Sequence, residues 1–247
     1  MKLKDFKEMI NQTVFCAPIE TFVRRSRHRE MLKVYLEKSG GKLIMAATNN
    51  RRMGLASRVA EDFPDFQGLL VPAEVLQKIA KRKRDMVPLS ISVYGNDVVF
   101  HIGSTCVLTA ALPEKFIQFP RNPEEFPQIF PLSFTADRSA LVEAFGAVSI
   151  MLDLQHWLPK IYLDILPGTL VLHAGNDNYG SAEHEIPCDY SGEKTEMIFH
   201  ARFFSEILEH IDAERIKIRF DAQNATVVIL PEPEQEHHYF LGQIRRN

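Results

Sequence analysis

Side chains that could carry catalysis or hold a metal occur at three places in the sequence. The stretch "HEIPC" (184–188) combines a histidine with a cysteine, "HH" (237–238) follows an acidic loop, and "GNDNYG" (175–180) contains a single carboxylate. None of the three supplies a nucleophile with its base, a set of metal ligands at a usable spacing, or a glycine-rich loop for a phosphate. We therefore predict no catalytic residue, no metal site and no cofactor, and expect that the protein is not an enzyme.

The three cysteines and the N-terminus narrow the class of protein further. Cys16, Cys106 and Cys188 are far apart, odd in number and outside any C-x-x-C arrangement, which predicts neither a disulfide framework nor a zinc knuckle. The opening "MKLKDFKEMINQ" is charged throughout, and no segment of the chain is apolar enough to span a membrane. These features predict a cytoplasmic protein.

Basic side chains gather in two clusters, and these are the stronger chemical signal. One is "RRSRHRE" (24–30), and the other is "QKIAKRKRD" (77–85), in which five of the seven residues 78–84 are basic. Helical periodicity places Lys78, Lys81 and Arg82 on one face, with Lys83 and Arg84 finishing the helix. The helix dipole also favours cations in a last turn, although five exceed what that effect requires. The clusters favour contact with a polyanion.

The charge is divided unequally along the chain. Residues 1–123 hold 20 Lys and Arg against 12 Asp and Glu, whereas residues 124–247 hold 9 against 20. Between the halves lies "FPRNPEEFPQIFP" (119–131), whose four prolines predict an extended connector. The sequence therefore predicts two domains, residues 1–122 and 123–247. The asymmetry fits a first half that faces a polyanion, and it also fits two domains that differ only in surface composition.

The elements that position these side chains recur. A short strand leading into an amphipathic helix is predicted at 69–83, 132–148 and 197–211, and a worn copy at 1–10. Each copy is followed by three strands joined by hairpin turns, at 31–59, 88–112 and 160–187 for example. The unit of one strand, one helix and three antiparallel strands is thus used four times, twice in each domain. The predicted fold class is α+β, with helices on one face of antiparallel sheets.

At this point the sequence resembles a known family, the β sliding clamps of bacterial DNA polymerase III. The resemblance is carried by "LIMAATNNRRMGLA" (43–56), by "LVLHAGNDNYGSAEHEIPCDYSGEKTEMIFHARFFSEIL" (170–208) and by "HHYFLGQIRR" (237–246). It implies domains of the DNA-clamp (processivity) fold and a ring that encircles duplex DNA. The chain resembles the middle and C-terminal domains of the family, which usually has three domains per chain.

The resemblance also implies two sets of site residues. The first would line a groove between the two domains that takes a short linear peptide, with an apolar floor and an arginine rim. It comprises Met31, Thr48, Asn50, Arg51, Arg52, Met53, His200, Phe203, Asn224, Thr226, Phe240, Leu241, Gly242, Gln243, Ile244 and Arg245. The second would contact DNA phosphates without reading bases and comprises Arg24, Arg25, Arg27, Arg29, Lys78, Lys81, Arg82 and Lys83. Trp157 is a further candidate near the groove.

Some positions depart from the family pattern. The usual tail Met-Pro-Met-Arg is Gly242-Gln243-Ile244-Arg245 here, and the Asp-Gly-His before the second arginine is Asn49-Asn50-Arg51, which makes the rim more basic. An ordinary type I′ Asn-Asn turn followed by solvated arginines remains the alternative interpretation of this hairpin. The Phe-Pro that closes the middle domain could align with residues 116–117 or with 126–127.

Two functions follow from these features, and one further class stays open. The first is a clamp on double-stranded DNA that tethers polymerase and clamp-loader subunits through short linear motifs, assembled as a homo-oligomeric ring. Three chains of two domains would supply six modules, and the opposite charges of the halves favour head-to-tail contacts. The second is an adaptor that binds such peptides without encircling DNA. An intrinsic nuclease or nucleotidyltransferase activity depending on Asp177 or His184 is the enzymatic alternative.

Overall fold

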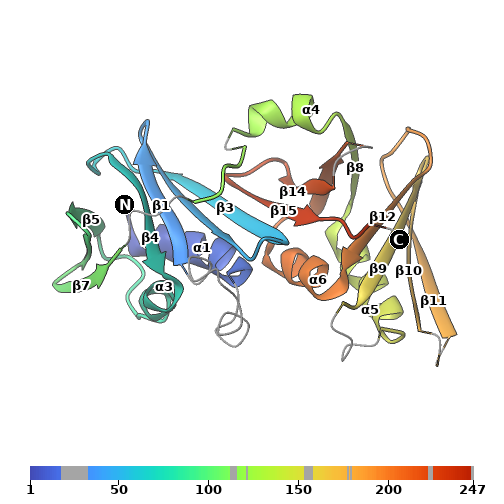
Figure 1. The fold of residues 1–247 in the computed structure, drawn as a ribbon, viewed down its shortest axis with the longest axis horizontal. Helices are drawn as coiled ribbons and strands as arrows, with labels where there is room; N and C mark the ends of the chain where they lie inside the picture. The colour runs from blue at the N-terminus through green and yellow to red at the C-terminus, as the bar shows by residue number, and fades with distance from the viewer. Residues whose placement is uncertain are drawn as a thin grey trace. The chain divides into compact units, whose positions relative to one another are not determined.

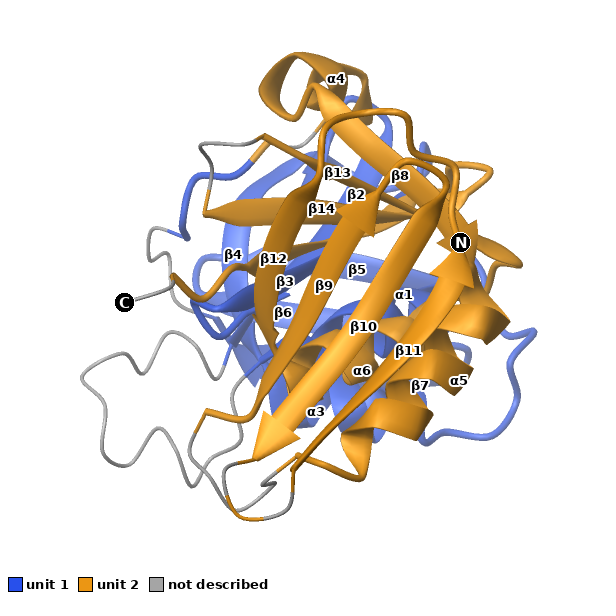
Figure 2. Cartoon of the chain, turned by 90° about the vertical axis from the view of Figure 1, so that its right-hand side faces the viewer, with its two compact units in different colours: residues 1–119 blue, residues 120–247 orange. Residues whose placement is uncertain are grey.

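The computed structural model describes the chain except for residues 18–32, 112–115, 121, 153–157, 177, 179, 222–224 and 246–247. The chain divides into two compact units, unit 1 (residues 1–119) and unit 2 (residues 120–247), which are coloured separately in Figure 2. The division lies within three residues of the boundary predicted from the sequence. Each unit is described by itself below.

Unit 1 contains two helices and seven strands in its described residues, together with one 3-10 turn (Figure 1). In chain order these are α1 (Leu3–Thr13), η1 (Val14–Cys16), β1 (Lys33–Ser39), β2 (Lys42–Thr48), β3 (Arg52–Val59), β4 (Phe66–Pro72), α3 (Ala73–Ala80), β5 (Leu89–Tyr94), β6 (Asp97–Ile102) and β7 (Thr105–Ala110). One sheet has the order β4-β1-β2-β3 and the other the order β5-β6-β7. Every strand pair within these sheets is antiparallel.

Unit 2 repeats the same arrangement with a fuller set of strands. Its elements are η3 (Pro123–Glu125), α4 (Phe126–Ile129), β8 (Leu132–Asp137), α5 (Arg138–Ser149), β9 (Lys160–Leu166), β10 (Thr169–Asn176), β11 (Gly180–Pro187), β12 (Thr195–His200), α6 (Ala201–His210), β13 (Arg215–Phe220), β14 (Thr226–Glu232) and β15 (His237–Gly242). The strand orders are β11-β10-β9-β12 and β15-β14-β13-β8, again antiparallel. In Figure 2 the first of these sheets lies in front of α5 and α6.

The repeats exchange their first strands. In unit 2, β8 precedes α5 in the chain but pairs with β13, while β12 precedes α6 but pairs with β9. In unit 1, β4 likewise pairs with β1, and the worn copy at the N-terminus is reduced to a single bridge between Lys2 and Pro88. The predicted fourfold use of one strand, one helix and three strands is thus confirmed, as is the α+β fold class.

Apolar residues at helical spacing bury one face of each long helix. In α1 the buried positions are Leu3, Phe6, Met9, Ile10 and Thr13, and burying each large apolar side chain contributes about 1.5–3 kcal/mol. In α5 the buried residues are Leu141, Ala144 and Val148. Val142, on the other side of the helix, is 41% exposed. Asp137 begins α5 by accepting a hydrogen bond from the Ala140 amide at 2.9 Å.

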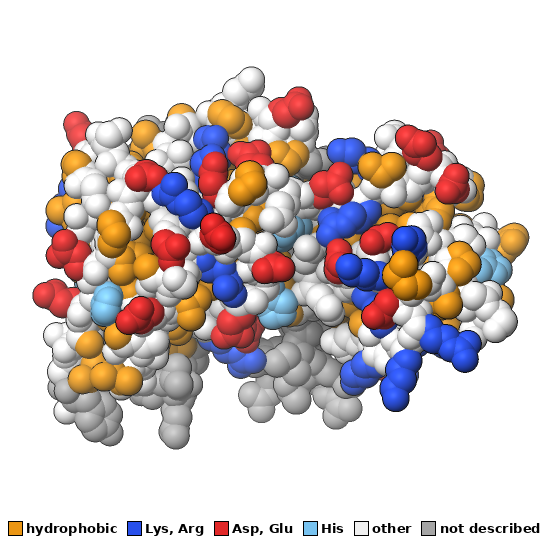
Figure 3. Space-filling view, turned by 180° about the vertical axis from the view of Figure 1, so that it is seen from behind, with side chains coloured by type: hydrophobic (Ala, Val, Ile, Leu, Met, Phe, Trp, Pro, Cys, Tyr) orange, Lys and Arg blue, Asp and Glu red, His pale blue; other side chains and the backbone are white. Residues whose placement is uncertain are grey.

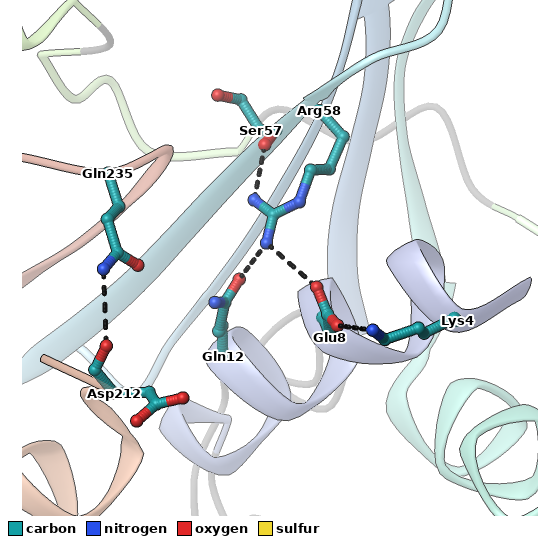
Figure 4. A network of polar contacts seen from close by, with 7 residues as sticks. All are labelled: Lys4, Glu8, Gln12, Ser57, Arg58, Asp212 and Gln235. Carbon is teal, nitrogen blue, oxygen red and sulfur yellow. Dashed lines mark hydrogen bonds and ion pairs between the residues drawn. The ribbon is translucent and has the colours of Figure 1, made fainter. Parts of the chain in front are cut away.

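A polar network fixes α1 against β3 on the surface of unit 1 (Figure 4). The Arg58 guanidinium donates to the Gln12 side chain at 3.1 Å and to the Ser57 carbonyl at 2.8 Å. It also lies 3.7 Å from Glu8, which pairs one helical turn away with Lys4 at 3.8 Å. These side chains orient the helix, and the buried apolar face provides the larger share of its stability.

Residues 123–129 of the proline-rich connector are helical and not extended, which corrects the sequence-based expectation. Pro123 and Pro127 occupy first-turn positions of η3 and α4. A proline is tolerated there because the backbone N–H groups of a first turn have no acceptor within the helix. The Asn122 side chain accepts from the Glu124 amide at 3.1 Å and caps η3. Phe126, which is fully buried, then packs edge-on against Phe240 and holds α4 on unit 2.

Candidate functional site

The β2–β3 hairpin is built by side-chain caps that leave Arg51 in solvent and turn Arg52 inward. The Asn49 side chain accepts from the amides of Arg51 and Arg52 at 3.0 and 2.9 Å, and Thr48 Oγ1 donates to the Arg52 carbonyl at 2.8 Å. Asn50 adopts a positive φ of 66°, a conformation that Asn tolerates better than most residues. The side chains of Thr48 and Met53, which face each other in register, are both buried.

Arg52 does not belong to an exposed rim, contrary to the expectation from the sequence. Its side chain is 6% exposed, its Nη2 donates to the Phe15 carbonyl at 2.6 Å, and its Cζ lies 5.0 Å from the centroid of the Phe15 ring. The arginine thus links the hairpin to η1, and the alternative interpretation with two solvated arginines is also wrong for Arg52. Phe15 was not singled out in the sequence because the contact joins positions 37 residues apart.

The position of Gly54, just after Met53 in the hairpin, has no room for a side chain. A Cβ atom at this position would lie 2.9 Å from the Gln12 carbonyl oxygen and 3.1 Å from Cys16 Sγ. The last turn of α1 and the η1 turn can therefore approach β3 only where no side chain intervenes. The close approach brings Phe15 within reach of Arg52.

In unit 2 the C-terminal tail folds back beside the start of α6. After β15, the Gln243 amide donates to the Ala225 carbonyl at 2.7 Å, and the Ile244 amide donates to the Ile198 carbonyl at 2.8 Å. The second bond attaches the tail to β12, two residues before His200. The rings of His200 and Phe203 stack with centroids 4.1 Å apart, and both residues are half-buried.

The structure therefore brings one group of predicted peptide-contact residues together within unit 2. Phe240 and Leu241 are buried in β15, Thr226 pairs in register with Gly242, and Arg245 is exposed. The half-buried side chains that share this surface, which we call the tail surface, are those of His200, Phe203, Gln243 and Ile244. Met31, Asn224 and Trp157 lie outside the described residues.

Of the predicted DNA-contact residues, some lie outside the described residues and the others are in unit 1. The arginine cluster Arg24, Arg25, Arg27 and Arg29 lies outside the described residues. Lys78, Lys81 and Lys83 are exposed, whereas Arg82 is half-buried and donates to Thr105 Oγ1 at 3.0 Å. On the face drawn in Figure 3, Lys and Arg side chains are more concentrated over unit 1, and Asp and Glu side chains over unit 2.

The helix that carries these lysines is shorter than the sequence predicts. α3 ends at Ala80, so Lys81, Arg82 and Lys83 follow it in a loop rather than lying on its face. The Lys7 ammonium group donates to the Arg82 carbonyl, and the Lys4 amide donates to the Asp85 carbonyl at 2.8 Å. The start of α1 thus takes the carbonyl groups that a longer α3 would have used, which the local sequence could not indicate.

The other polar groups of the described residues give no sign of a metal centre. No group of three or more His, Cys, Asp or Glu side chains that could hold a metal ion occurs in the part of the chain that the structure describes. His173 stacks on Tyr162 at 4.9 Å and lies 3.6 Å from Asp164, as an ordinary strand residue does. Within the described ranges, no helix combines the length and apolarity needed to cross a membrane.

Comparison with known proteins finds a match to the second unit. Residues 124–245 match the family described as "DNA polymerase III beta subunit, C-terminal domain". This segment is therefore similar to the C-terminal domain of the DNA polymerase III β subunit. The match includes the whole of the tail surface, from His200 to Ile244.

The resemblance extends beyond that segment. The β sliding clamp of Treponema pallidum is 25% identical over 221 residues, which cover 87% of this chain and 57% of the relative. The β sliding clamp of Caulobacter vibrioides is 27% identical over 209 residues, covering 81% and 54%. The chain thus spans a little over half the length of these relatives. The resemblance to β sliding clamps that the sequence predicts is confirmed.

Solved structures show the same fold along the full chain. The crystal structure of a DNA polymerase sliding clamp from Pseudomonas aeruginosa superposes with a TM-score of 0.85 at 19% identity, covering 100% of this chain and 66% of that one. A DNA polymerase III β subunit from Thermotoga maritima gives a TM-score of 0.84 at 18% identity, covering 100% and 65%. Both units therefore have the fold of clamp domains.

Proposed function

We propose that this protein is a non-catalytic sliding clamp. It encircles duplex DNA without reading its sequence and tethers polymerase and other DNA-processing proteins through a peptide-binding surface. The observation that carries the proposal is the tail surface, where the Ile244 amide bonds the Ile198 carbonyl and places the tail beside His200 and Phe203. Relatives named as β sliding clamps support it, and we equate unit 1 with their middle domain and unit 2 with their C-terminal domain.

The chemistry of the tail surface suits an extended peptide with apolar anchors. The stacked rings of His200 and Phe203 and the half-buried Ile244 provide apolar area, and the exposed Arg245 provides a cation at its margin. A peptide of this kind gains most of its affinity from a few buried anchors, while a charge at the rim orients it. We propose peptides with Leu or Phe anchors as ligands, as found in short linear motifs.

We further propose that three chains close a ring of six units. β7 is the outermost strand of its sheet in unit 1, and β11 is the outermost strand of the β11-β10-β9-β12 sheet in unit 2. No strand of the described residues pairs with the outer edge of either, and such edges readily pair with another chain. Pairing β7 of one chain with β11 of the next is a head-to-tail contact, which the opposite charges of the two halves favour.

The decisive experiment uses circular DNA. The protein should remain on nicked circular duplex through gel filtration and should be lost after the circle is cut once by a restriction enzyme, because a ring slides off a free end. Light scattering at several concentrations should give the mass of three chains. An adaptor would bind the peptides but would show no difference in retention between circular and linear DNA. That result would replace the proposal.

The enzymatic alternative is tested separately. Labelled DNA incubated with the protein and a divalent metal ion should remain intact, because the relatives are named as clamps and not as nucleases. Turnover that disappears in Asp177→Asn or His184→Gln would overturn the non-catalytic assignment.

A further inference from the structure

Three polar side chains form a row across the open face of the β5-β6-β7 sheet. Ser92 lies on β5, His101 on β6 and Cys106 on β7, and His101 is the direct cross-strand neighbour of Cys106. Phe100 and Ile102, which flank His101 in the chain, point to the opposite face and are buried. The alternation of a strand therefore places the three side chains together on the exposed side of the sheet.

The distances within this row are those of a nucleophile, its base and a group that orients the base. Cys106 Sγ lies 3.3 Å from His101 Nδ1, and His101 Nε2 lies 3.1 Å from Ser92 Oγ. In the neutral imidazole, Nδ1 can accept the thiol proton while the Nε2–H group donates to Ser92. An imidazole in this position removes the proton that makes a thiol a poor nucleophile.

The other two cysteines lack these features. Cys16 is fully buried. Cys188 is 7% exposed, and burial, together with the charge of Asp189, raises the pKa of its thiol. Both thiols are therefore shielded in the folded protein, whereas Cys106 is exposed and faces a base. The chain thus offers two internal controls for the reactivity of the third thiol.

We propose that Cys106 is a reactive modification site that forms a mixed disulfide with small disulfide molecules. His101 takes the Cys106 proton as the sulfur attacks one sulfur of the disulfide R–S–S–R. A Cys106–S–S–R bond forms, the original S–S bond breaks, and R–S⁻ leaves and takes a proton from the imidazolium. The small disulfide is thus the oxidant, and one R–SH is released for each thiol that reacts.

The surroundings of Cys106 favour a disulfide with apolar groups. Leu108, on the same strand and the same face, is 65% exposed, and Val99 is its cross-strand neighbour. Tyr94 and Asp97 are the other titratable side chains of this face and lie at the opposite end of the sheet. Arg82 bonds Thr105, whose side chain points to the other face. An aromatic group attached to sulfur can therefore cover apolar surface beside the thiol without meeting a fixed charge.

The test follows release of thiopyridone from 2,2′-dithiodipyridine by the intact protein. We expect one fast equivalent per chain, which Cys106→Ser abolishes and which Cys16→Ser and Cys188→Ser leave unchanged. At a pH of about 6.5, His101→Gln should lower the rate constant at least about tenfold, because general-base assistance is lost. The two rate constants should converge above a pH of about 10, where thiols ionise without a base.

His173→Gln provides the matched control, because His173 is also a half-exposed strand histidine but contacts no cysteine among the described residues. Ser92→Ala should give a smaller decrease than His101→Gln. A wild-type rate constant equal to that of His101→Gln at every pH would overturn the proposal, since Cys106 would then be merely exposed. The assay needs neither DNA nor peptide.

Discussion

The Ile244 amide donates a hydrogen bond to the Ile198 carbonyl at 2.8 Å, and this single bond joins the end of the chain to the strand that leads into α6. Gln243 and Ile244, the first two residues after β15, are held at a defined place by this bond and by the bond from the Gln243 amide to the Ala225 carbonyl. The tail and the stacked rings of His200 and Phe203 belong to the same surface but to different segments of the chain. Separate variants can therefore distinguish their contributions to binding.

The first prediction concerns the tail. Removal of residues 243–247 should weaken binding of a peptide with Leu and Phe anchors at least about tenfold, because the surface beside His200 loses its outer wall. The unfolding temperature should change little, since the core residues Tyr239 and Leu241 remain. Fluorescence anisotropy with a labelled peptide measures the affinity, and Lys194→Ala, at an exposed position outside the tail surface, is the control. Unchanged affinity after truncation would remove the tail from the binding surface.

The two neighbouring arginines should behave differently. Arg52→Ala should destabilise unit 1 by about 2–3 kcal/mol, because the variant loses a charged hydrogen bond to the Phe15 carbonyl and the cation–π contact with its ring. Arg51→Ala should change the free energy of unfolding by less than about 0.5 kcal/mol, as at most exposed positions. Urea unfolding followed by circular dichroism compares the two. Equal effects would contradict the buried anchor.

Acid should destabilise unit 2 through a buried histidine. Burial, and next the charge of His237, lowers the pKa of His238 from 6.5 to about 3, so the unfolded state binds the proton more tightly. The stability that His238 contributes is therefore fully present above a pH of about 6.5 and is lost as the pH falls toward 3. Between pH 7 and pH 5 this one group should cost about 2 kcal/mol.

His238→Phe isolates this effect, because the ring packs edge-on against Phe126 and Phe240 and the replacement keeps the planar shape. Between pH 7 and pH 5, the free energy of unfolding should fall by about 2 kcal/mol less in the variant than in the wild type. Chemical denaturation at several pH values measures both slopes, with His173→Gln as a histidine that is half exposed. Parallel slopes for wild type and His238→Phe would show that His238 does not cause the acid sensitivity.

Two glycine-to-alanine changes should have opposite signs. At Gly68 in β4 a Cβ atom would lie 2.2 Å from the Tyr35 ring, which Phe116 holds in place by stacking at 5.0 Å. Gly68→Ala should therefore cost about 1–3 kcal/mol. Gly146 lies within α5 with open space around the same position, and Gly146→Ala should stabilise by about 0.5–1 kcal/mol through helix propensity. Thermal unfolding of both variants provides the check.

The exposed lysines within and just after α3 should contribute to the salt dependence of DNA retention. Replacing Lys78, Lys81 and Lys83 by Gln should reduce the salt dependence of DNA retention, because fewer counterions are released when phosphates are contacted. Arg82→Gln should instead affect stability, since that side chain bonds Thr105. Retention on nicked circles at several salt concentrations measures the slope. An unchanged slope in the triple variant would place the DNA contacts elsewhere.

The sequence predicts the elements of this fold well because each depends on local pattern. Strand alternation and helical spacing indicate the repeats, and the turn residues separate them. What it misses depends on contacts between distant positions. The end of α3 is set by Lys7, the inward turn of Arg52 by Phe15, and the helix within the connector by the packing of Phe126 on β15 residues. The row from Ser92 to Cys106 could have been found by aligning the faces of its three strands.

The exchange of first strands between repeats has a consequence for how each unit holds together. Because β8 completes the sheet of the second repeat and β12 completes the sheet of the first, neither half of unit 2 contains its own finished sheet. Unit 2 is in effect a strand-swapped dimer whose two subunits have been joined into one polypeptide. Fragments cut between β11 and β12 would be expected to associate by mutual complementation, each supplying the strand that the other lacks.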